Sequence, residues 1–92
     1  MTEDARRAAA IQKFYEVYRE LQKYDSLRLR TRMELGGEAL IEITRYSGEN
    51  PGDRILRITQ EDEAIAYEQA TDQLINMLDR RRKDRKAGQR GA

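Results

Sequence analysis

The side chains that most often carry out chemistry are scarce in this chain. It contains no histidine and no cysteine, so the usual general base near neutral pH, the thiolate nucleophile and the thiolate metal ligand are all missing. Its two serines, Ser26 and Ser47, lie in predicted turns and have no histidine to activate them. We therefore expect a protein that is not an enzyme and that has no cofactor.

Carboxylates are abundant, but their spacing indicates structural roles. Glu38 and Glu42 could pair as acid and base, yet Glu42 is expected to face Arg32 across a hairpin and to form an ion pair with it. Residues 49–53 contain Glu49, Asn50 and Asp53, but they lack the alternating ligands and the final bidentate glutamate of a calcium loop. We expect no metal site and assign this segment to a polar turn.

The net charge of +1 conceals two opposite fields. Residues 80–92 carry seven basic side chains and one acidic one, whereas residues 1–79 carry eleven basic and sixteen acidic side chains. Such an asymmetry is typical of a chain whose basic end meets an anionic partner.

Composition limits the class of protein. Ninety-two residues, of which 38% are hydrophobic and 38% charged, allow one domain with a small core. The start of the chain is acidic and no apolar run approaches the ~20 residues of a membrane span, which predicts no signal peptide, no membrane span and a cytoplasmic location.

Two segments have the 3-and-4 spacing of apolar residues that is typical of an amphipathic helix. The first runs from Asp4 to about Tyr24. The second is expected to start after an N-cap at Thr59 and to end near Gly88, with residues 1–86 as one domain and residues 87–92 as a disordered basic tail. The predicted core positions are Ala8, Ile11, Phe14, Tyr15, Tyr18 and Leu21 in the first helix, and Ala64, Tyr67, Thr71, Leu74, Ile75 and Leu78 in the second.

Three strands are predicted between the helices. Apolar and charged residues alternate over 27–35, a second apolar run covers 39–46, and a third strand covers 54–59. A three-residue loop of Gly36, Gly37 and Glu38 would pair Met33 with Ile41. The expected fold is α+β with the order α-β-β-β-α, a three-stranded antiparallel meander with two helices on one face.

This element order is similar to that of the double-stranded-RNA-binding domain and of a family of dimeric bacterial nucleoid proteins. The RNA-binding family opens its second helix with lysines that contact phosphate, whereas this chain has Glu61, Asp62 and Glu63 there. The resemblance is therefore one of element order alone, and no binding residue of either family is assigned to this chain.

Two surfaces are candidates for binding nucleic acid with low specificity. On the open sheet face, guanidinium groups can contact phosphates and an aromatic ring can stack on a base. At the end of the second helix, consecutive cations can neutralise phosphates and release counterions. The predicted residues are Arg28, Arg30, Arg32, Tyr46, Arg57, Arg80, Arg81, Arg82, Lys83, Arg85 and Lys86.

A second hypothesis is a small adaptor or inhibitor, of the kind that bacteria and their phages make, which docks on a host protein complex. Its acidic helix would meet a basic partner, and exposed apolar residues of the sheet face would anchor it. The residues predicted for this surface are Glu61, Asp62, Glu63, Glu68, Asp72, Leu40 and Ile55. A third hypothesis is a homodimer whose open sheet faces pack together.

Overall fold

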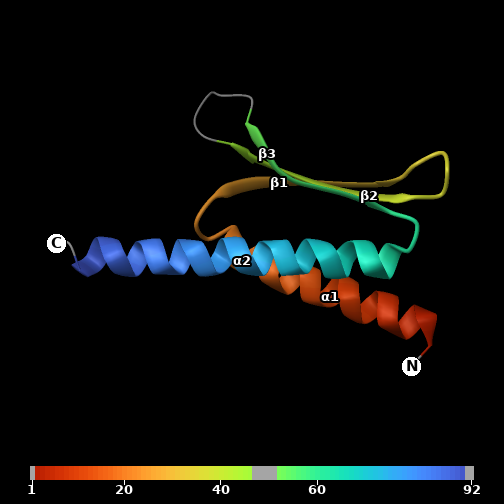
Figure 1. The fold of residues 1–92 in the computed structure, drawn as a ribbon, viewed down its shortest axis with the longest axis horizontal. Helices are drawn as coiled ribbons and strands as arrows, with labels where there is room; N and C mark the ends of the chain where they lie inside the picture. The colour runs from red at the N-terminus through yellow and green to blue at the C-terminus, as the bar shows by residue number, and fades with distance from the viewer. Residues whose placement is uncertain (1, 47–51, 91–92) are drawn as a thin grey trace.

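The fold is a three-stranded sheet with two helices on one side. The structure, a computed structural model, describes residues 2–46 and 52–90, with the backbone alone for residues 85–90. Its elements are α1 (Glu3–Leu21), β1 (Ser26–Met33), β2 (Ala39–Tyr46), β3 (Asp53–Gln60) and α2 (Glu63–Arg90). The strands are antiparallel in the order β1-β2-β3, and both helices lie on the same side of them (Figure 1). This confirms the predicted α-β-β-β-α architecture.

Helix α1 is capped at its start and buried along one face. The side-chain oxygen of Thr2 accepts a hydrogen bond of 3.1 Å from the backbone N–H of Ala5, which satisfies one of the unpaired donors of the first turn. The helix ends at Leu21, earlier than the predicted end near Tyr24. Its buried residues are Ala10, Phe14, Val17, Tyr18 and Leu21, so the buried face is rotated slightly from the predicted one, and the predicted core residue Ala8 is exposed.

An aromatic cluster joins the two helices. The ring of Phe14, which is fully buried, meets Tyr67 of α2 edge to face at 5.2 Å between centroids and stacks on Tyr18 at 5.9 Å. Burial raises the pKa of the Tyr18 and Tyr67 hydroxyls above their ordinary value. Small residues of α2, Ala66 and Ala70, are completely buried, which allows close packing of neighbouring elements.

The β1–β2 hairpin has a three-residue loop, but it lies one residue earlier than predicted. The loop is Leu35, Gly36 and Gly37, because the Gly37 N–H donates to the Glu34 carbonyl at 2.9 Å and the Glu34 N–H donates to the Glu38 carbonyl at 2.7 Å. Gly37 has φ +84°, the left-handed conformation that this loop type requires. The predicted pairing was therefore wrong by two residues: Met33 pairs with Ala39, and each side chain keeps its expected face.

A β-bulge changes which way part of β3 faces. Ile43 of β2 pairs with Leu56, but the next residue, Thr44, pairs with Arg54, so Ile55 is an extra residue on β3. Ile55 packs against the core beside Leu56. The prediction that it points to the open face was wrong, and Arg54 takes that face instead.

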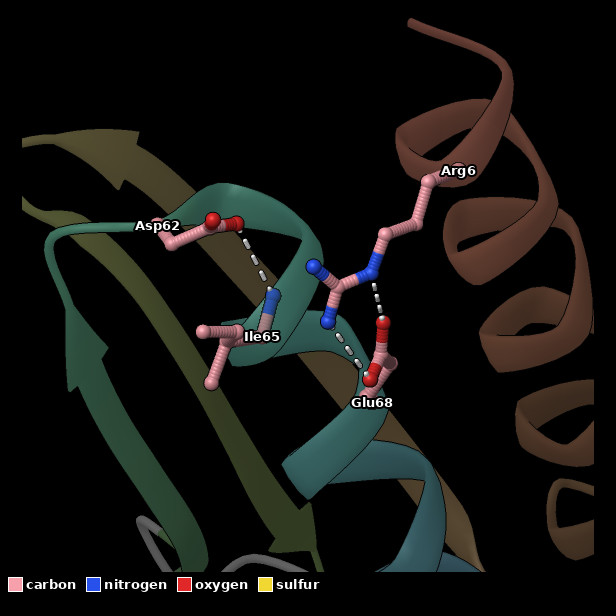
Figure 2. Close-up of polar contacts among 4 residues, drawn as sticks. All are labelled: Arg6, Asp62, Ile65 and Glu68. Carbon is pink, nitrogen blue, oxygen red and sulfur yellow. Dashed lines mark hydrogen bonds and ion pairs between the residues drawn. The ribbon is translucent and has the colours of Figure 1, made fainter. Parts of the chain in front are cut away.

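Helix α2 starts later and ends later than expected. Thr59 is a residue of β3, paired with Leu40, and so it does not cap the helix. Asp62 does: its carboxylate accepts a hydrogen bond of 3.2 Å from the Ile65 N–H (Figure 2). The backbone is helical to Arg90, past the predicted end at Gly88. The last turns of α2 extend beyond the sheet (Figure 1).

Candidate nucleic-acid interface

Charge is divided between the two ends of the molecule, which is 50 Å long. The start of α1, the β1–β2 turn and the connection from β3 to α2 lie together at one end, and the C-terminal part of α2 lies at the other (Figure 1). The first group carries Glu3, Asp4, Glu34, Glu38, Glu61, Asp62 and Glu63, and we call it the acidic end. The other, with Arg80, Arg81, Arg82 and Lys83, is the basic end.

The sheet face opposite the helices presents five exposed arginines. Because directly paired residues of antiparallel strands point to the same side, the register places these side chains in rows across the sheet. The rows are Arg28, Thr44 and Arg54, then Arg30, Glu42 and Arg57, then Arg32, Leu40 and Thr59. We call Arg28, Arg30, Arg32, Arg54 and Arg57 the arginine face. Arg54 was not predicted to belong to it, since only the bulge turns it outward.

Glu42 is the one carboxylate that the described strands place among these arginines. It pairs directly with Arg30 on one side and with Arg57 on the other, and its Oε2 lies 3.7 Å from Nη1 of Arg54. The predicted pair between Glu42 and Arg32 was wrong, because of the shifted register. Arg32 instead forms an ion pair of 3.2 Å with Glu34. Within the part of the chain that the structure describes, Arg30 and Arg57 form no ion pair.

Tyr46 and Arg28 form a contact at the end of the arginine face that is nearer the basic end. The guanidinium carbon of Arg28 lies 5.0 Å from the centroid of the Tyr46 ring, which is a cation–π geometry. Tyr46 is half-buried. One face of its ring is thus already covered, and a base that stacks here would meet the Arg28 guanidinium or displace it.

The predicted cations at the end of α2 differ in what they contact. Arg81 donates two hydrogen bonds, of 2.9 and 2.8 Å, to the carboxylate of Asp25 in the turn after α1, and the pair is partly buried. Arg82 lies 3.8 Å from Glu20 of α1. Arg80 and Lys83 are exposed and form no ion pair among the described residues. The side chains of Arg85 and Lys86 lie outside the described part of the structure.

The residues predicted for a protein-binding surface are spread over different environments. Glu68 accepts hydrogen bonds of 3.0 and 3.3 Å from Arg6 (Figure 2), and this contact raises the pKa of Arg6. Glu63 lies 3.9 Å from Arg7, while Glu61 and Asp72 are exposed. Leu40 is only 3% exposed, although its register places it on the open face, so the prediction that it is an exposed anchor was wrong.

The described residues also bear on metal binding and on membrane insertion. Within residues 2–46 and 52–90, no group of three or more acidic side chains is arranged to hold a metal ion. Glu49 and Asn50 of the polar turn lie outside the described residues, and Asp53 lies 4.0 Å from Arg45. Neither helix, over the residues described, is long and apolar enough to cross a membrane.

Comparison with known proteins does not place the chain in a family, because no protein-family model, no curated protein and no solved structure matches it. The arginine face and the basic end are therefore the features of this protein that bear on its function.

Proposed function

We propose that this protein is a non-enzymatic module that binds nucleic acid with low sequence specificity, through the arginine face and the exposed cations at the end of α2. The observation that carries the proposal is the arginine face itself. Five exposed guanidinium groups share one uncovered sheet surface, and the described residues pair two carboxylates with them, Glu34 with Arg32 and Glu42 with Arg54. An anionic partner of some length would neutralise this surplus of positive charge.

The spacing of the arginines suits a phosphate backbone. Arg28, Arg30 and Arg32 are alternate residues of β1, so their Cα atoms are about 6.8 Å apart along the strand. Arg54 and Arg57 form a second line on the opposite edge strand, β3. Each guanidinium that contacts a phosphate releases condensed counterions, and the fork of N–H donors makes directional hydrogen bonds to the phosphate oxygens. The energy of such binding does not depend on base sequence.

Tyr46 and Arg28 would add contacts to unpaired bases. Aromatic rings and guanidinium planes both stack on bases, and one stacked base contributes about 1–3 kcal/mol by alanine substitution. This contribution needs an exposed base face, which a duplex offers only at its ends. We therefore expect the arginine face to bind a single strand more tightly than a duplex of equal length.

The division of charge would orient the complex. The acidic end repels a polyanion, while Arg80 and Lys83 at the basic end attract it, and such a field raises association rates at low salt. The nucleic acid would run from the arginine face past Tyr46 toward the end of α2. A cytoplasmic location is part of the proposal and agrees with the absence of cysteine, because a reducing compartment does not support disulfides.

Fluorescence anisotropy with a labelled single strand of 20 nucleotides tests the proposal. We expect the double variant Arg30→Gln/Arg57→Gln to bind far more weakly than the wild type at ~0.1 M salt, since each lost phosphate contact with a single strand costs up to about fivefold there. The matched control is Lys13→Gln/Arg19→Gln, which removes the same charge from exposed positions of α1.

The two double variants distinguish binding at the sheet from an effect of net charge. A large loss of affinity in Arg30→Gln/Arg57→Gln (the sheet variant), with near-normal affinity in the control, supports binding at the arginine face. Equal losses in both variants mean that net charge alone drives binding, and no binding of any strand at ~0.05 M salt refutes the function.

A further inference from the structure

A cavity of about 400 Å³ lies at the basic end, where the end of α1, the neighbouring ends of β2 and β3, and the second half of α2 meet. Its apolar lining comes from three elements: Leu21 of α1, Ile55 of β3 and Met77 of α2. Leu21 is 1% exposed, and Ile55 and Met77 are half-buried against the core. The volume is within the usual range of about 300–1,000 Å³ for small-ligand sites.

Ile55 reaches this cavity because of the β-bulge in β3. Without the extra residue, strand alternation would place Ile55 on the open face of the sheet and leave this wall of the cavity to a charged neighbour. Met77 lies on the opposite side, on α2, and its unbranched side chain adapts to the shape of a bound group. The cavity therefore has apolar walls that differ in rigidity.

The charged groups that line the cavity leave an excess of positive charge. The carboxylate of Asp25 is already occupied by both hydrogen bonds from Arg81. Arg45 is 4.0 Å from Asp53, whose side chain is 84% exposed, so that pair is weak. Arg80 has no ion pair among the described residues. Among the described lining residues, two guanidinium groups, Arg45 and Arg80, are thus available to a ligand, against one exposed carboxylate, Asp84.

We propose that this cavity binds a small organic anion, in which a carboxylate, phosphate or sulfonate is joined to an apolar group about the size of one or two rings. The anionic head contacts the guanidinium groups of Arg45 and Arg80. The apolar body lies against Leu21, Ile55 and Met77. This site is separate from the arginine face, and it stands whether or not the protein binds nucleic acid.

Methionine methyl NMR locates the ligand, because the described methionines lie at opposite ends of the molecule. Met77 lines the cavity, whereas Met33 lies at the end of β1 near the acidic end and is 60% exposed. The probe is anilinonaphthalene sulfonate, an anion on an apolar ring system. We expect a saturable shift of the Met77 methyl signal and no comparable shift of Met33. Equal shifts at both methyl groups, or a shift that never saturates, would overturn the proposal.

Variants and a neutral probe test the anionic head. Arg45→Gln and Arg80→Gln should each weaken binding of the sulfonate about tenfold, as expected for the loss of one charge-assisted hydrogen bond. Lys83→Gln is the matched control, since Lys83 is an exposed cation on the same helix and does not line the cavity. Phenylnaphthylamine, which lacks the sulfonate, should bind at least tenfold more weakly than the sulfonate. Unchanged affinity in both arginine variants, or equal affinity for the two probes, would show that the cavity does not select anions.

Failure of this proposal is distinguishable from failure of nucleic-acid binding. The double variant Arg30→Gln/Arg57→Gln leaves the cavity lining intact, so it should bind the sulfonate as the wild type does. Loss of sulfonate binding in that variant would place the probe on the arginine face and contradict the cavity site.

Discussion

The hydrogen-bonded pair between Arg81 and Asp25 should be the strongest electrostatic contribution to stability among the described ion pairs. It fastens α2 to the turn that leads from α1 into β1, 56 residues away in sequence. Arg81→Gln removes the cation and leaves the Asp25 carboxylate, whose side chain is only 16% exposed, without its counter-charge. The change also keeps most of the side-chain length, so loss of packing is small.

The magnitude follows from the exposure of the pair. Exposed ion pairs contribute about 0–1 kcal/mol, whereas breaking a fully buried pair costs about 3–5 kcal/mol. With Arg81 at 37% and Asp25 at 16% exposure, we expect Arg81→Gln to lower the free energy of unfolding by about 1.5–2 kcal/mol. For a domain of this size, this corresponds to a fall in Tm of roughly 10 °C.

Urea and thermal unfolding measure this loss, and a neighbouring pair supplies the control. Arg82→Gln breaks the contact with Glu20, which is 3.8 Å long and has side chains 50% and 44% exposed, so it should cost less than about 0.5 kcal/mol. In a double-mutant cycle, Asp25→Asn/Arg81→Gln should recover part of the single-variant loss, with a coupling energy of about 1 kcal/mol or more. If Arg81→Gln were no more harmful than Arg82→Gln, the assignment of Arg81 to a structural pair would be wrong.

Three other predictions concern the core and the turns. Burial raises the pKa of Tyr18 and Tyr67 in the folded protein, so the tyrosines of the unfolded chain ionise first as pH rises. Their contribution to stability should be fully present below pH 10 and should fall above it. Urea unfolding between pH 7 and 11 measures this dependence, and a free energy of unfolding that does not change with pH would contradict it. Gly37→Ala should lower the free energy of unfolding by about 1 kcal/mol, because Gly37 has φ +84°. Gly36→Ala should leave it nearly unchanged, because the added Cβ would meet open space. Equal effects of the two variants in thermal unfolding would refute the turn assignment. Asp62→Ala should cost about 1 kcal/mol in thermal unfolding through loss of the α2 N-cap, and no change would place the cap elsewhere.

The local sequence pattern was sufficient to predict the order of the elements and the two faces of β1. The alternation of residues 27–35 indicates a strand with arginines on one face, and the structure places Arg28, Arg30 and Arg32 there. The exact register could not be read from the sequence, because either of two adjacent glycines can supply the positive φ. The loop closes at Gly37, and the register shifts by two residues as a result.

Most features of the candidate site that could not be predicted from the sequence depend on contacts between residues far apart in the chain. Arg54 joins the arginine face only because β3 bulges at Ile55, and nothing in residues 54–59 signals that bulge. The sequence also groups Arg80 to Lys83 as equivalent cations. Arg81 differs from them through its partner Asp25, which folding brings beside it.

The salt dependence of single-strand binding tests the central claim most directly. For each phosphate contact, the slope of log K against log salt changes by about 0.7 with single strands. If Arg30 and Arg57 each contact a phosphate, the variant Arg30→Gln/Arg57→Gln should lower the magnitude of that slope by about 1.4 relative to the wild type, and the control Lys13→Gln/Arg19→Gln should leave it unchanged. An identical slope for the wild type and the sheet variant would contradict the claim that the arginine face binds nucleic acid.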